Sequence, residues 1–109
     1  MNLRAARAAK ASNAWDAALH HLAIARELVG DDAHERDYER WLAIARMTAE
    51  TSYVLGDEER TRTEVAEILA HARTVEDRAA AYRVRLLALL ARGEPEKAIV
   101  AAKELARIL

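Results

Sequence analysis

Residues 56–68 read GDEERTRTEVAEI, and this stretch decides the fold because the chain contains a related pattern three times. The other two copies read WDAALHHLAIA at residues 15–25 and GEPEKAIVAAKEL at residues 93–105. Repetition at intervals of about 40 residues is typical of stacked helical hairpins, none of which can bury its own apolar face alone. Such arrays usually bind or connect other proteins and seldom carry chemistry.

Apolar residues recur at helical spacing through most of the chain, and no stretch alternates with the period of a strand. The pattern predicts an all-α fold of about six helices in a single domain of residues 1–109. The expected helices cover about residues 2–12, 14–29, 34–55, 58–72, 76–92 and 95–108. We expect them to pair across short turns into three antiparallel hairpins, at about residues 2–29, 34–72 and 76–108.

Turn residues separate these helices. Glycine ends a helix readily because it adopts the left-handed conformation without a Cβ penalty. Gly occurs only at positions 30, 56 and 93. Asp57 and Glu94 are expected to cap the helices that follow them. Thr74 with Asp77 resembles a capping box, and Pro95 suits a first helical turn.

The three copies resemble the second half of tetratricopeptide repeats. In that family a small residue of the second helix allows close approach, and a larger apolar residue follows four positions later. The matching pairs are Ala18 with Leu22, Thr61 with Val65, and Ala98 with Ala102. The small residues lie 43 and 37 positions apart, more than the usual 34. The resemblance implies a divergent tetratricopeptide-like, right-handed solenoid.

A second resemblance covers nearly the whole chain and involves large bacterial signalling proteins. The segments that carry it are LRAARAAKASNA (3–14), AAL (17–19), ERDYE (35–39), YVLGD (53–57) and ART (72–74). In that family a kinase-like domain and a P-loop ATPase precede a helical-repeat segment, and GAF and histidine-kinase domains often follow. The resemblance implies that this chain is the repeat segment of such a protein, a fragment of a larger whole.

Composition excludes several other classes of function. Seventeen basic and eighteen acidic side chains give a net charge of −1, without the basic surplus that a nucleic-acid interface needs. No apolar run approaches the roughly 20 residues that span a bilayer, and the N-terminus does not read as a signal peptide. The absence of Cys fits a reducing compartment. We therefore expect a cytoplasmic protein that binds neither nucleic acid nor membrane.

The residues that could carry chemistry have simpler structural interpretations. His20 and His21 are adjacent on a helix, so they point about 100° apart and cannot chelate one ion together. His34 and His71 belong to no recognised zinc motif. The glycines stand singly, so no phosphate loop exists, and paired carboxylates occur where helix starts favour negative charge. We predict no enzyme activity, no metal and no cofactor.

Two groups of residues are candidates for interactions. Tyr38, Arg40 and Trp41 lie early on the longest expected helix and are the candidates for holding a partner protein or peptide. The last helix carries more apolar residues than one buried stripe needs, which predicts a homodimer or contact with further repeats. The residues concerned are Ile99, Leu105, Ile108 and Leu109.

The leading hypothesis is a non-catalytic interaction or regulatory module of a multidomain signalling ATPase, in contact with a protein, a peptide or neighbouring domains of its own chain. One alternative is a free-standing adaptor that binds peptides, although its three Lys and two Asn residues poorly match a carboxylate clamp. Another is a self-associating or engineered scaffold without a ligand.

Overall fold

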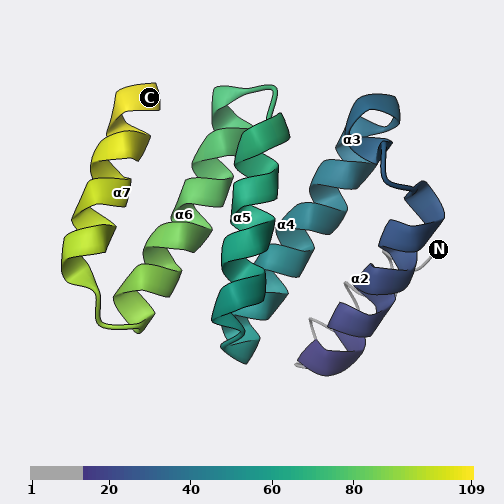
Figure 1. Cartoon of the computed structure of the whole chain (residues 1–109), viewed down its shortest axis with the longest axis horizontal. Coiled ribbons are helices and arrows are strands. Elements are labelled where there is room, and N and C mark those ends of the chain that lie inside the picture. The colour runs from purple at the N-terminus through teal and green to yellow at the C-terminus, as the bar shows by residue number, and fades with distance from the viewer. Residues whose placement is uncertain (1–13) are drawn as a thin grey trace.

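The computed structural model describes residues 14–109, and this part of the chain is entirely helical, with no strand (Figure 1). Its helices are α2 (Trp15–Val29), α3 (Ala33–Arg36), α4 (Tyr38–Leu55), α5 (Glu58–His71), α6 (Val75–Ala91) and α7 (Pro95–Ile108). The prediction of an all-α fold is thus confirmed for these residues. The helix expected at residues 2–12 lies outside the described part of the chain.

The helix expected at residues 34–55 is wrong at its start, because α3 and α4 are separate helices. Asp37 lies between them with φ −145° and ψ 67°, outside the helical region. The side chain of Arg36 turns back to the preceding link, where it donates to Asp32 Oδ1 at 2.9 Å and to the carbonyl of Val29. These hydrogen bonds tie Arg36 to the link between α2 and α3, and α4 begins only after Asp37.

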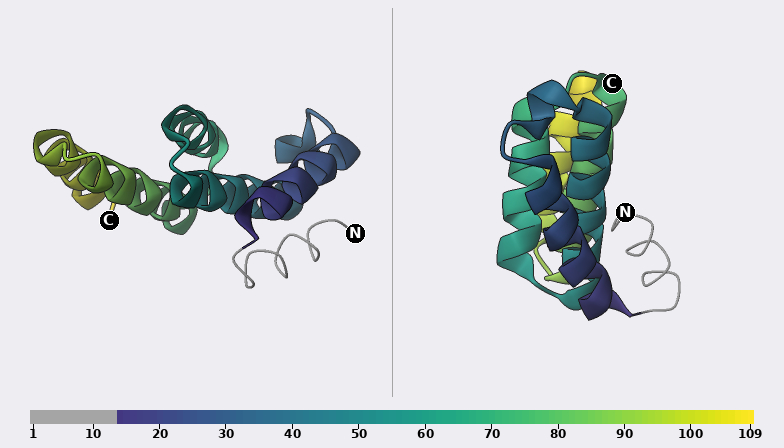
Figure 2. Two further views of the ribbon diagram at one scale, coloured as in Figure 1. Left: turned by 90° about the horizontal axis from the view of Figure 1, so that it is seen from below. Right: turned by 90° about the vertical axis from the view of Figure 1, so that its right-hand side faces the viewer.

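The helices form a shallow stack about two helices thick. Helix α2 packs on α4, α5 packs on both α4 and α6, and α7 packs on α6. Figure 2 shows α5 standing above the row that contains α4 and α6. The extents of 39 × 30 × 20 Å agree with two layers, since one helix with its side chains is about 10 Å across.

Small side chains allow the helices to approach closely. Alanine supplies nine of the eighteen buried apolar residues of the core. A larger cluster joins α4 to α5 and α6 around Trp41, Leu42 and Ile68, and a smaller one joins α2 to α4 around Leu22 and Ile44. The core is therefore distributed along the stack and follows the helix contacts.

The threefold pattern marks buried positions, with one exception. The aligned small residues Ala18, Thr61 and Ala98 are all buried, and so are Leu22 and Val65 four positions after the first two. In the third copy Ala102 is exposed, and its neighbour Ala101 is buried instead. The expected pair of Ala98 with Ala102 is wrong, because the face of α7 that packs on α6 contains residues three positions apart, Ala98 and Ala101.

Most of the expected helix ends are confirmed. Asp57 caps α5 by accepting the backbone N–H of Arg60 at 3.1 Å, and Thr74 caps α6 by accepting that of Asp77 at 3.1 Å. Glu94 differs from the prediction, since its side chain makes no capping hydrogen bond to α7. Its carboxylate is held instead by Lys97 at 2.9 Å. Among residues 14–109, no helix has the length and apolar character needed to cross a membrane.

Candidate binding groove

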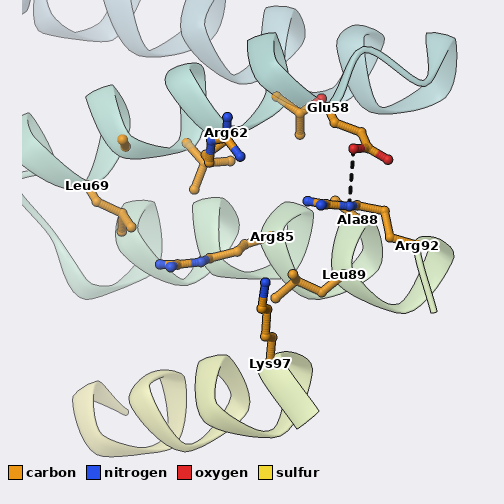
Figure 3. A pocket seen from close by; sticks show the side chains of 11 residues that line it. Glu58, Arg62, Leu69, Arg85, Ala88, Leu89, Arg92 and Lys97 are labelled. Atoms are coloured by element: carbon orange, nitrogen blue, oxygen red, sulfur yellow. Dashed lines mark ion pairs between the residues drawn. The ribbon is translucent and has the colours of Figure 1, made fainter. Parts of the chain in front are cut away.

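A groove of about 500 Å³ runs over α6 between α5 and the start of α7 (Figure 3). We call it the α5–α7 groove. Its lining residues are Glu58, Thr61, Arg62, Val65, Ala66 and Leu69 of α5, Arg85, Ala88 and Leu89 of α6, Arg92 of the α6–α7 turn, and Lys97 of α7. The groove lies where α5 and α7 both pack on α6.

Helical spacing places an apolar stripe along the inside of the groove. On α5, Thr61, Val65 and Leu69 follow one another at four-residue intervals and therefore share one face. On α6, Ala88 and Leu89 lie on the facing stripe, and both are half-buried. The inner surface of the α5–α7 groove is thus mainly apolar, as is usual for surfaces that bind other molecules.

Basic side chains surround this apolar stripe. The lining contains four cations and a single carboxylate, and the cations come from all three helices. Figure 3 shows Arg62 on α5, Arg85 along α6 and Lys97 reaching across from α7. Within residues 14–109 Arg62 makes no salt bridge, and Arg85 makes only a long one, at 3.9 Å to Glu104. Uncompensated positive charge is therefore concentrated around Arg62 and Arg85.

The opposite end of the groove is closed by ion pairs. Arg92 Nε lies 3.2 Å from Glu58 Oε2 and 3.2 Å from Glu94 Oε2, so one guanidinium joins α5 to the α6–α7 turn. Lys97 pairs with the same Glu94 at 2.9 Å. The hydrogen bond from Lys97, with the charge of Arg92 nearby, holds the pKa of Glu94 below its usual range. This end is electrostatically satisfied, unlike the end around Arg62.

An equivalent groove lies one repeat earlier, between α2 and α5 over α4. It is smaller, about 200 Å³, and an ion pair crosses it. Arg26 donates to Glu64 through both terminal nitrogens, at 2.5 and 2.7 Å, and this hydrogen bonding raises the pKa of Arg26. Such a bidentate pair is among the stronger polar contacts in proteins. We call this site the α2–α5 groove.

The repeat alignment explains why only one groove is open. The offsets of 43 and 37 residues that relate the three copies place Leu69 where the earlier repeat has Arg26, and Ala101 where it has Glu64. Both partners of the crossing ion pair are thus replaced by apolar residues. No such pair therefore crosses the α5–α7 groove at this level, which leaves the half-buried side chains of Leu69, Ala88 and Leu89 accessible.

The residues expected to hold a partner lie elsewhere and differ among themselves. Tyr38 and Trp41 are buried, whereas Arg40 is exposed and pairs with Asp37 at 3.5 Å. None of the three lines the α5–α7 groove, and Trp41 contributes to the wall of the α2–α5 groove. Because Tyr38 and Trp41 are buried, they contribute to packing within the fold. A role of Tyr38, Arg40 and Trp41 in partner binding stays a prediction.

Two histidines far apart in the sequence, His34 of α3 and His71 at the end of α5, lie side by side. The rings of His34 and His71 stack at 3.8 Å with an interplanar angle of 16°. Trp41 presents its edge to both rings, at 6.0 Å and 5.7 Å. Within the described residues, no group of three or more His, Asp or Glu side chains is arranged to hold a metal ion.

The residues expected to mediate self-association divide into two kinds. Ile99 and Leu109 are 56% and 80% exposed, respectively. Leu105 and Ile108 are half-buried. The outer surface of α7 therefore carries exposed apolar side chains, with Val100 beside Ile99.

The comparisons add no relative to this description: the chain matches no protein-family model, no curated protein and no solved structure. The groove residues Arg62, Arg85 and Leu89 were not among the candidates from the sequence. Their positions on helix faces can be read from the sequence. The groove itself cannot, because the separation of α5 from α7 depends on how both helices pack on α6.

Proposed function

We propose that this chain is a non-catalytic helical-repeat module that binds a segment of another protein, or of a neighbouring domain, in the α5–α7 groove. The observation that carries the proposal is the open, mainly apolar α5–α7 groove beside an equivalent groove that the chain closes with its own ion pair.

The proposal also includes the repeat architecture and the parent protein that the two sequence resemblances imply. The helices would stack as a tetratricopeptide-like right-handed solenoid, and the module would belong to a cytoplasmic bacterial signalling ATPase, relaying partner binding to its nucleotide switch. The packing of α5 on both α4 and α6 supports a continuous stack. The coding sequence provides the test: a P-loop motif upstream in the same reading frame supports this setting, and a short independent reading frame contradicts it.

Binding in the groove is tested by blocking it. Peptides would be selected from a displayed library of random 16-residue sequences, and their affinity measured by fluorescence anisotropy. Ala66 lies exposed on the α5 wall, so Ala66→Trp fills the groove without disturbing the core. The matched control is Ala23→Trp, at an exposed position on α2. We expect binding to be lost in the first variant and kept in the second. Selected peptides that bind both variants equally would refute the proposed site.

A second candidate function is self-association through α7, favoured by the exposure of Ile99 and Leu109. Exposed apolar patches of this kind mark contact surfaces in many proteins. Light scattering over a range of concentrations should then show a dimer, which the double variant Ile99→Lys, Leu109→Lys converts to a monomer. A wild-type protein that stays monomeric at high concentration would rule this function out.

A further inference from the structure

We infer that the segment bound in the α5–α7 groove is an amphipathic α-helix with acidic side chains along both edges of its apolar face. This inference rests on the proposed function and names the chemistry of the partner. Three features of the groove carry it: its shape, the placement of its cations, and its contrast with the α2–α5 groove.

The shape favours a helix. On the α5 wall, Thr61, Val65 and Leu69 recur at the four-residue spacing of a helix ridge. Thr61 and Val65 are buried and form the base of this wall, whereas half-buried Leu69 and exposed Ala66 are accessible to a partner. Helix α5 contains 14 residues, which gives a wall of about 21 Å at 1.5 Å per residue. The fold already fills one such space with a helix, since α5 itself lies across α4 and α6. An incoming helix with apolar residues at i, i+4 and i+7 would use the same packing.

The cations decide the charge of the partner. Arg62 lies on the α5 side of the apolar stripe and Arg85 on the α6 side (Figure 3), whereas Lys97 of α7 is already paired with Glu94. A helix lying over Leu69 and Leu89 would therefore pass between Arg62 on one edge and Arg85 on the other. Glu or Asp at its flanks would pair with them, whereas Lys or Arg would meet like charge. At the other end of the groove, Arg92 is already paired with Glu58 and Glu94. An acidic partner would therefore dock mainly at the end near Arg62.

The α2–α5 groove has the opposite character and serves as an internal comparison. Its lining contains three carboxylates, from Asp31, Glu64 and Glu67, and one cation, Arg26, which Glu64 already holds. An acidic helix would be repelled there, even if the ion pair opened. The repeat thus offers two related grooves of opposite charge, and only the α5–α7 groove suits an acidic partner.

The random library described above also tests this inference, because it favours neither helices nor acidic residues. We expect the selected peptides to be enriched in Glu and Asp beside apolar positions at helical spacing, and to become helical by circular dichroism on binding. The double variant Arg62→Glu, Arg85→Glu should raise Kd at least about tenfold, and higher salt should weaken wild-type binding. Arg83→Glu is the matched control, since Arg83 lies exposed on α6 outside the groove.

The possible failures are distinguishable. Suppose that Ala66→Trp abolishes binding of the selected peptides. The inference would still be overturned if these peptides carried no excess of acidic residues, bound as extended chains, or bound the Arg62→Glu, Arg85→Glu variant as tightly as wild type. The groove would then remain a binding site. No selected peptide, or peptides insensitive to Ala66→Trp, would overturn the proposed function as well. Unchanged helicity and melting temperature of each variant would show that the fold is intact. A variant that unfolds would be replaced by the corresponding Gln substitution.

Discussion

The hydroxyl of Tyr38 donates a 2.6 Å hydrogen bond to Asp77 Oδ2, 39 positions along the chain. The same hydroxyl accepts the backbone N–H of Arg73 at 2.9 Å, and the Arg73 guanidinium lies 4.3 Å from the ring centroid. In a capping box, the carboxylate of Asp77 would turn back to the start of its own helix. Here it is used on α4 instead, so one tyrosine joins the start of α4 to the α5–α6 turn.

Tyr38→Phe tests this connection because it removes the hydroxyl and keeps the ring. The backbone N–H of Arg73 and the carboxylate of Asp77 would both lose a partner. Hydrogen bonds to charged groups contribute about 1.5–3 kcal/mol when well buried, so at this partly exposed turn we expect a loss of about 1–2 kcal/mol. Urea unfolding gives the measurement. Tyr53→Phe, at a half-buried position outside this network, should change stability by less than about 0.5 kcal/mol.

Alkaline pH should weaken the same connection. Burial, and then the hydrogen bond to Asp77, raises the pKa of Tyr38 above its ordinary value of 10.0. Below that value the tyrosine is protonated in both states and its contribution to stability is complete. Above it the unfolded chain loses its proton first, so stability falls until the higher folded pKa is passed. The free energy of unfolding, measured from about pH 8 to 11, should therefore fall more steeply for wild type than for Tyr38→Phe. Parallel curves would contradict this.

The ion pair between Arg26 and Glu64 should respond unequally to loss of its two partners. The Glu64 side chain is 7% exposed and the Arg26 side chain 43%. Arg26→Met would leave a buried carboxylate without its cation, which we expect to cost about 1–3 kcal/mol. Glu64→Gln would leave a guanidinium that can reach water, at a cost below about 1 kcal/mol. Thermal and urea unfolding of both variants measure the order, and a larger loss for Glu64→Gln would contradict it.

Helix α2 allows the apolar contacts of the first repeat to be tested at matched positions. Leu22 is 1% exposed and Leu28 is 73% exposed on the same helix. Leu22→Ala should destabilise the protein by about 2–4 kcal/mol, because it removes packed methyl groups and leaves a cavity. Leu28→Ala should change stability by less than about 0.5 kcal/mol. Equal losses in urea unfolding would mean that α2 buries a different face.

Local signals were enough to predict most of the helices and most of their ends, but not the break between α3 and α4. The glycines at 30, 56 and 93 all adopt positive φ, and the caps at Asp57 and Thr74 are formed by their immediate neighbours. The break at Asp37 could not be read in this way. It depends on Arg36 binding back to the link before α3, and nothing in the periodicity of residues 34–55 indicates that contact.

The candidate site was harder to predict because it depends on distances between helices. Leu69 and Arg85 can be assigned to helix faces from the sequence, but the gap between α5 and α7 arises only from their packing on α6. Tyr38 and Trp41 were candidates for partner binding because they lie early on the long expected helix, and in the structure contacts with Asp77 and with the histidine pair bury them. An aromatic residue at helical spacing does not reveal which neighbour covers it.

The register of α7 provides the last test, because sequence and structure disagree there. The repeat alignment places a packing position at Ala102, whereas the structure buries Ala101 against α6 and exposes Ala102. Ala101→Leu should force extra volume into a filled contact and cost about 1–3 kcal/mol. Ala102→Leu adds the same atoms on the solvent side and should lie within about 0.5 kcal/mol of wild type. Both substitutions introduce a strong helix former, so helix propensity does not separate them. Urea unfolding of the two variants would therefore report the register alone, and a greater loss for Ala102→Leu would favour the alignment over the observed packing.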